Sequence, residues 1–522
     1  MTPADLAIFD GSKQHLMTKI LNLRLYCLLS LLFSMICNSS IGMAIDTPVI
    51  KSGIAKLTGT ITVQNKTGGD SIYVNITVPH PISGEFAKYT ALVDESGKFS
   101  IDADVETAIS LIRLSTTLGS GKALLIKLKS GDATNINLSY DSNFEVAHIN
   151  VKPDMNQHDM LRCFGLVGEM IEYQSDSFLE RLYDKPVDYF FDHSKKVLFE
   201  RLSVVRKDTL ISKELKELLS NDFKLFLYKV SAFDYEGNMR GNYRLTGGDQ
   251  NTIPVINKID RSYFRFLKDF KLNDPQYLHA FTFLEFQKSI LQDSILGLPA
   301  IGDSDIPSWL NKAKAILSDL VGFSDGQYYD ILAANAYGIQ LNEELRPLSQ
   351  KQIDNIKRYW NDGDIAKILL RKNEQVVDLD QYKTPAFIHD VSSVPDDKVM
   401  ETIISKHKDK VVLIDLWATW CTPCLNAMQE FRRAKGELKD KEVVFVYLTN
   451  TSSPRKLWEE KIKTIGSEHY YLTDGQWKYI MEHFEFEYIP SYLLYNKKGL
   501  LISKFSAFPG SDKVKNMINE LL

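Results

Sequence analysis

The spacing of apolar residues changes twice along the chain, and each spacing predicts a different architecture. Between residues 46 and 153, apolar and polar positions alternate, as they do from Leu57 to Val63 and from Ile72 to Ile76. A period of two is typical of strands that bury one face. Turn signals such as Ser96-Gly97 separate these short runs. We therefore predict an N-terminal antiparallel β-sandwich-like domain over residues 46–153.

From residue 154 to residue 372 the spacing becomes helical, which predicts a central all-α domain. One face of a helix would carry Ile211, Leu215, Leu218, Leu219, Phe226 and Val230. Ser349 and Gln352 have the spacing of a capping box at a helix N-terminus. Aromatic residues are dense between Tyr263 and Phe286. They would form either a ligand-binding face or a core between helices, and we favour the core.

The last part of the chain alternates strands with helices. Residues 373–384 carry charges without a clear period, so we predict a linker there and a C-terminal α/β domain over residues 385–522. Apolar runs at Val411–Trp417 and Val443–Leu448 read as strands of a parallel-centred sheet. The helices follow each run, and a hairpin closes the domain between Tyr492 and Phe505.

Composition excludes several classes of protein. The 522 residues carry a formal net charge of −5, which argues against nucleic acid as a partner. Five cysteines are too few for a scaffold held by disulfides, and the ten histidines are scattered. A structural zinc site needs about four ligands, so one cysteine pair is a poor candidate. We predict no metal and no cofactor.

Residues 1–45 resemble a secretory signal peptide. Lys19 and Arg24 precede an apolar run that ends at Cys37, and small residues follow as far as Ala44. A lipid anchor on Cys37 is less favoured because Ile36 is not small, and an uncleaved anchor is a further alternative. We therefore expect a protein of the periplasm or cell envelope. Its mature chain would keep one cysteine pair and Cys163, which we expect to be a buried thiol.

The candidate chemistry lies at Cys421 and Cys424. A strand followed by Cys-x-x-Cys at the start of a helix is the arrangement of a dithiol redox site. Unpaired N–H groups and the positive end of the helix dipole favour a thiolate at Cys421. Cys424 could then close a disulfide with it. A static structural disulfide is the alternative, but so small a loop constrains the unfolded chain very little.

Asp415 lies within the apolar strand that precedes the pair. A carboxyl buried there must find a partner or shift its pKa upward. A raised pKa suits a proton relay that takes the proton from Cys424. The alternative is an aspartate at the end of the strand that points to solvent.

The stretch from Asp415 to Cys424 resembles the Asp-Phe-Trp-Ala-x-Trp-Cys-x-x-Cys motif of thioredoxin-fold proteins. The export signal, Pro423 and the sequence after Ile489 look most like the TlpA/ResA-like branch, in the exported multidomain form of Bacteroidetes. This resemblance implies a C-terminal thioredoxin fold with a cis-proline at Pro490. It also implies a substrate-binding surface made by Trp420, Ile489 and Pro490. The motif covers only about the last 150 residues.

These features predict an exported thiol-disulfide oxidoreductase, with Cys421, Cys424 and Asp415 as catalytic residues. We favour a protein disulfide reductase that acts through a mixed disulfide. Its partners would be disulfide-containing proteins and, as the resemblance implies, a membrane thiol electron donor. Two alternatives stay open: an oxidase or isomerase that uses the same residues, and an envelope binding protein whose dithiol is secondary.

Overall fold

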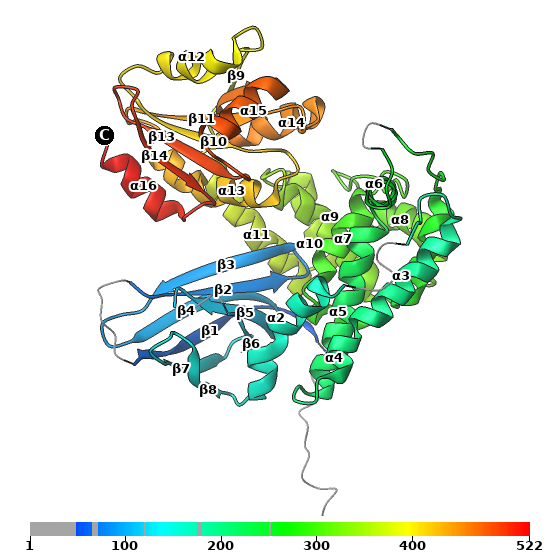
Figure 1. The fold of residues 1–522 in the computed structure, drawn as a ribbon. Helices are drawn as coiled ribbons and strands as arrows, with labels where there is room; N and C mark the ends of the chain where they lie inside the picture. Colours follow the sequence, from blue (N-terminus) through cyan, green and yellow to red (C-terminus); the bar gives the residue numbers. More distant parts are fainter. Residues whose placement is uncertain (1–47, 65–70, 119–121, 175–179, 250–251) are drawn as a thin grey trace, which may run out of the picture.

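The computed structural model describes residues 48–64, 71–118, 122–174, 180–249 and 252–522 (Figure 1). The predicted signal peptide, residues 1–45, lies outside these ranges. No helix in the described part of the chain is long and apolar enough to cross a membrane.

The first region is built from two four-stranded sheets. One sheet has the order β4 (Lys98–Thr107), β1 (Ile50–Val63), β7 (Ala133–Tyr140) and β8 (Val146–Lys152). The other has the order β3 (Glu85–Leu92), β2 (Tyr73–His80), β5 (Ile109–Thr116) and β6 (Leu124–Lys129). Alternate apolar residues of both sheets, such as Leu57 and Ile126, are buried in one shared core. The period of two arises from this one-sided burial.

The prediction that this region is antiparallel throughout is wrong at one pair of strands. Strand β1 pairs with β7 in parallel, with Lys56 opposite Ala133 and Val63 opposite Tyr140. Parallel pairing needs a long connection, and the chain from β2 to β6 supplies it. The apolar period is two in both orientations, so the pattern could not distinguish them.

Helices make up the central region. The α-helices are α2 (Gln157–Glu172), α3 (Val187–Arg201), α4 (Ser203–Lys207), α5 (Lys213–Ser231), α6 (Tyr235–Leu245), α7 (Phe283–Gln292), α8 (Ile306–Val321), α9 (Gln327–Asn342), α10 (Gln350–Trp360) and α11 (Asp364–Asp380). The expected capping box of Ser349 and Gln352 is present at the start of α10. Cys163 is buried on α2, as predicted.

The aromatic segment packs inside the helical region, which supports core packing over a ligand-binding face. The 3₁₀ helices η1 (Arg261–Phe270) and η2 (Pro275–His279) contribute Phe264, Phe270 and Tyr277 to the largest buried cluster of the described residues, and α7 contributes Phe286. Val230 departs from the predicted apolar face because its side chain is 45% exposed.

The linker prediction is wrong over its first part, because α11 continues to Asp380. Val376 is buried in the helical core, and the Asn373 side chain accepts a hydrogen bond from the Leu348 backbone N–H at 2.7 Å. These contacts keep the charged segment helical, and only its last residues connect the two regions.

Buried polar contacts join the first sheet region to the helices. The Asn335 amide on α9 donates to the carbonyls of Pro81 and Ile82, both at 2.8 Å. Lys372 on α11 forms an ion pair with Glu85, and both are largely buried. Burial and the bonds from His80 and Lys372 act in opposite directions on Glu85, and the net effect lowers its pKa to about 2.

The C-terminal domain is a six-stranded sheet between two layers of helices. Its strand order is β14 (Leu501–Ser506), β13 (Ser491–Tyr495), β10 (Val411–Leu416), β11 (Val443–Thr449), β12 (Ser467–Tyr471) and β9 (Ala386–His389). One face packs against α13 (Thr422–Glu437), α14 (Arg455–Ile465) and α16 (Ser511–Asn519). The other packs against α12 (Val399–Ser405) and α15 (Asp474–His483). Strand β10 is fully buried between them.

We expect Asn335→Ala to lower the free energy of unfolding by about 2 kcal/mol, because two buried carbonyls lose their hydrogen-bond donor. Urea denaturation followed by circular dichroism measures the change. Asn516→Ala on the exposed side of α16 is the control, with an expected effect within about 0.5 kcal/mol. Equal transition midpoints for the two variants would contradict the prediction.

Candidate active site

The two cysteines lie at the start of α13, just after the loop that follows β10. Cys421 is the N-cap residue of α13, and its sulfur accepts a hydrogen bond from the Cys424 backbone N–H at 3.2 Å. The two sulfurs form a disulfide, with their Cα atoms 5.3 Å apart. Pro423 occupies the first turn, where no intrahelical bond to its nitrogen is needed. A thiolate at Cys421 would therefore receive both a backbone N–H and the positive end of the helix.

The loop before the pair leaves one large side chain in solvent. Trp417 and both cysteines are buried, whereas Trp420 is 62% exposed. The Trp420 indole N–H donates to the Ser452 hydroxyl at 3.2 Å, and the Thr419 backbone N–H donates to the Ser453 hydroxyl at 3.0 Å. These bonds hold an exposed aromatic ring directly beside Cys421.

The chain crosses the other side of the site at Pro490. Strand β13 runs antiparallel to β10 with Ser491 opposite Leu416, so Pro490 lies at the end of β10 that leads to the cysteines. The peptide bond between Ile489 and Pro490 is cis, as the resemblance implies. Pro490 is buried and Ile489 is partly exposed. The exposed Tyr488 side chain precedes them.

Asp415 is buried in the middle of the sheet rather than facing solvent. It lies opposite Tyr447 of β11 and Tyr492 of β13. Its Oδ1 atom has no hydrogen-bond partner among the described residues. Burial raises the pKa of this carboxyl well above its ordinary value, and the charge of Lys435 opposes that rise only in part.

Lys435 is a charged neighbour that the sequence analysis missed. It is buried on α13, and its ammonium donates to the Ile465 carbonyl at 2.5 Å and to the Tyr447 hydroxyl at 3.4 Å. Burial and the nearby Arg432 lower its pKa to about 7, against the raising effect of Asp415. Lys435 follows Phe431 by four residues, so both lie on the same helix face, which is buried at Phe431. That spacing in the sequence could have indicated that Lys435 is buried.

A small cavity adjoins the buried carboxyl. It is lined by Asp415 and Tyr492 from the sheet and by Ala427, Met428 and Phe431 from α13. The Tyr492 hydroxyl, like Asp415 Oδ1, lacks a hydrogen-bond partner within the described segments. Ala427 is three residues after Cys424, so the cavity lies one helical turn from the second cysteine. The carboxyl thus faces the helix that carries the dithiol.

The comparisons with known proteins agree on this domain. Residues 409–501 match a family model described as thioredoxin-like. A thioredoxin of Mycoplasma genitalium is 41% identical over 49 residues. That alignment covers 9% of this chain and 46% of the relative, so the chain spans about half the length of the curated protein it matches. The C-terminal domain is therefore thioredoxin-like.

The solved structures similar to this chain include the following three. The thioredoxin domain of a thiol-disulfide oxidoreductase from Bacteroides vulgatus is 19% identical, with 22% of this chain and 84% of that chain covered and a TM-score of 0.20. StoA from Bacillus subtilis is 19% identical, with 21% of this chain and 82% of that chain covered and a TM-score of 0.18. The exposed lipoprotein thioredoxin from Streptococcus pneumoniae is 21% identical, with 23% of this chain and 90% of that chain covered and a TM-score of 0.20.

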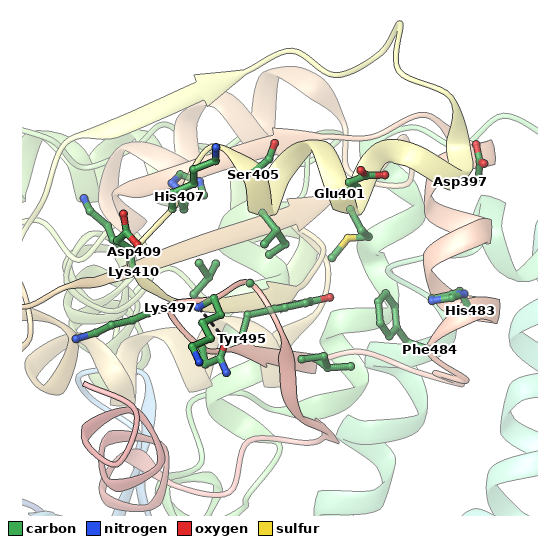
Figure 2. A pocket seen from close by; sticks show the side chains of 18 of the residues that line it. Asp397, Glu401, Ser405, His407, Asp409, Lys410, His483, Phe484, Tyr495 and Lys497 are labelled. Atoms are coloured by element: carbon green, nitrogen blue, oxygen red, sulfur yellow. Dashed lines mark hydrogen bonds between the residues drawn. The ribbon is translucent and has the colours of Figure 1, made fainter.

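A second pocket of the thioredoxin-like domain lies away from the cysteines. Figure 2 shows it between α12 and the β13–β14 hairpin, with Glu401 and Lys497 among its labelled residues. Val412 and Tyr495, which also line it, pair at the opposite end of β10 from Leu416. This pocket is therefore not part of the dithiol site. In the described ranges no group of three or more His, Cys, Asp and Glu side chains could hold a metal ion.

We expect Asp415→Asn to stabilise the protein at neutral pH. The raised pKa means that the folded state resists losing this proton, so the wild type loses stability as pH rises from the ordinary aspartate range towards the raised value. The variant removes that loss, and its gain should reach at least about 1 kcal/mol because one pKa unit equals about 1.4 kcal/mol.

Urea denaturation between pH 4 and pH 8 measures this difference. Asp440→Asn, on an exposed residue after α13, is the control and should follow the wild-type profile. A variant at Asp415 that is less stable than the wild type throughout this range would show that the carboxylate is stabilised where it lies.

Proposed function

We propose that the protein is an exported thiol-disulfide oxidoreductase that reduces disulfides in other proteins. The observation that carries this proposal is the disulfide between Cys421 and Cys424 at the N-terminus of α13. Residues 17–44 support export through their signal-like sequence. The exposed Trp420 and the partly exposed Ile489 would bind the substrate segment on either side of Cys421.

The reaction would begin with the reduced pair. The Cys421 thiolate attacks one sulfur of a substrate disulfide, forms a mixed disulfide and releases the other substrate sulfur as a thiolate. Cys424 then loses its proton to the Asp415 carboxylate and attacks the Cys421 sulfur. The second substrate thiolate leaves. Two electrons have passed to the substrate, and the protein holds the disulfide between its own cysteines.

Asp415 suits the role of the base because burial raises the pKa of its carboxyl, which makes the carboxylate a better proton acceptor than an ordinary aspartate. The cavity that it shares with Tyr492 lies next to α13, so one water molecule there would link the carboxyl to the helix of the dithiol. A membrane thiol electron donor would return two electrons to the pair after each turnover.

We expect Cys424→Ser to accumulate mixed disulfides with substrate proteins, because the resolving thiol is absent. Full-length protein is expressed with its leader, the cells are quenched with acid, and captured proteins are identified by mass spectrometry. Cys421→Ser is the matched control and should capture none. Cys163→Ser, which changes a buried thiol, should behave like the wild type. Equal capture by the Cys421 and Cys424 variants would refute the mechanism.

The direction of electron flow has a separate test. A reductase requires a low potential, so we expect a value near thioredoxin's, about −270 mV, rather than about −120 mV as in a strong oxidant. Equilibration with dithiothreitol buffers, followed by tryptophan fluorescence, measures the potential because Trp417 and Trp420 lie just before the pair in the sequence. A value near the upper figure would favour the oxidase or isomerase alternative.

A further inference from the structure

A cleft with mixed polar and apolar walls runs from the dithiol site into the contact between the thioredoxin-like domain and the helical region. Its volume is about 390 Å³, within the range of about 300–1,000 Å³ typical of ligand pockets. Trp420 lines the cleft at the dithiol, and Arg432 lines it farther along α13. Figure 1 shows α13 on the side of its domain that faces the helical region.

One face of α13 forms the floor of this cleft. Leu425, Met428, Arg432 and Lys435 recur at helical spacing and all line it. The floor therefore changes from apolar beside the cysteines to basic at its far end. Lys461 of α14 adds a third cation there, and no ion-pair partner lies within 4 Å of it in the described part of the chain.

Arg432 is a buried cation without a hydrogen-bond partner on its terminal nitrogens. Its side chain is only 5% exposed, and neither Nη1 nor Nη2 forms a hydrogen bond within the described segments. The nearest carboxylate oxygen, from Asp380, is 3.8 Å from Nη2, which is too long for a hydrogen bond. A buried guanidinium in this position is costly unless an anion meets it.

The opposite wall does not supply that anion. Glu343 faces the cleft, but Lys288 forms an ion pair with one of its oxygens at 2.6 Å and Gln292 donates to the other at 3.1 Å. Its charge is already matched within the helical region. Asp380, 3.8 Å from Nη2, is the carboxylate nearest to Arg432, and it makes no hydrogen bond with the guanidinium. The cleft therefore presents guanidinium N–H groups that lack an acceptor within the described segments, together with the ammonium of Lys461.

We propose that this cleft binds an acidic side chain of the substrate polypeptide, with Arg432 as the residue that determines specificity. The proposal rests on the reductase function proposed above. Arg432 lies ten residues beyond Thr422, or about 15 Å along the helix at about 1.5 Å per residue. An extended peptide covers that distance in four or five residues. The preferred substrate carries an Asp or Glu four or five residues from its reactive cysteine.

Two synthetic disulfide peptides test the proposal. They differ only at the fifth residue from the cysteine, which is Glu in one and Gln in the other. Stopped-flow fluorescence gives the second-order rate constant of each with reduced full-length protein. We expect the wild type to prefer the Glu peptide by about tenfold, as one charge-assisted hydrogen bond allows. Arg432→Gln should reduce this ratio to about one.

Arg433→Gln is the matched control, because Arg433 is exposed on the same helix and forms an ion pair with Glu437. It should keep the wild-type ratio. A wild-type ratio within twofold of one, or an undiminished ratio in Arg432→Gln, overturns the proposal. If the Arg432 variant does not fold, Lys461→Gln decides, since it should lower the ratio at least threefold. If the wild type reduces neither peptide, the proposed reductase function itself fails.

Discussion

The arrangement of the active site depends on the complete burial of strand β10. Its residues alternate between two cores, with Leu413 packed against the layer of α13 and Ile414 against the layer of α12. Pairing with β11 on one side and β13 on the other fixes its register. Two neighbouring strands and two layers of helices surround β10, so its last residues have a fixed position. The helix that carries the cysteines begins shortly after this point. Because both faces are apolar, the single carboxyl of Asp415 is isolated from water.

This isolation couples the chemistry of the site to its stability. The carboxyl that would accept a proton during turnover is held where its charged form is disfavoured. Lys435 lies in the same buried space with its own pKa lowered to about 7. Burial therefore disfavours the charged form of both groups beside the dithiol. Burying these ionisable groups lowers the free energy of unfolding but favours proton transfer, and the large apolar cores around the site compensate for the lost stability.

The sheet region and the helical region form one unit that packs against the thioredoxin-like domain. The sheet region and the helices are joined by buried polar contacts, including the bonds of Asn335 to the Pro81 and Ile82 carbonyls. Helix α11 leads from this unit to the last domain, where the Tyr382 ring lies against Gly436 of α13. The helical region thereby supplies one wall of the cleft that starts at Trp420. An isolated thioredoxin-like domain would have no such wall.

Local sequence determined much of this protein. Alternating and helical periods marked the strands and helices, and the Cys-x-x-Cys after an apolar strand marked the site, because these signals arise within one element. The parallel pairing of β1 with β7, the helical course of residues 373–380 and the short strands β9 and β12 depended on partners distant in sequence. Lys435 and Arg432 looked like ordinary helix cations. Only the tertiary structure buried Lys435 beside Asp415 and left the terminal nitrogens of Arg432 without a hydrogen-bond acceptor in the described part of the chain, because burial and hydrogen bonding depend on what packs against a helix.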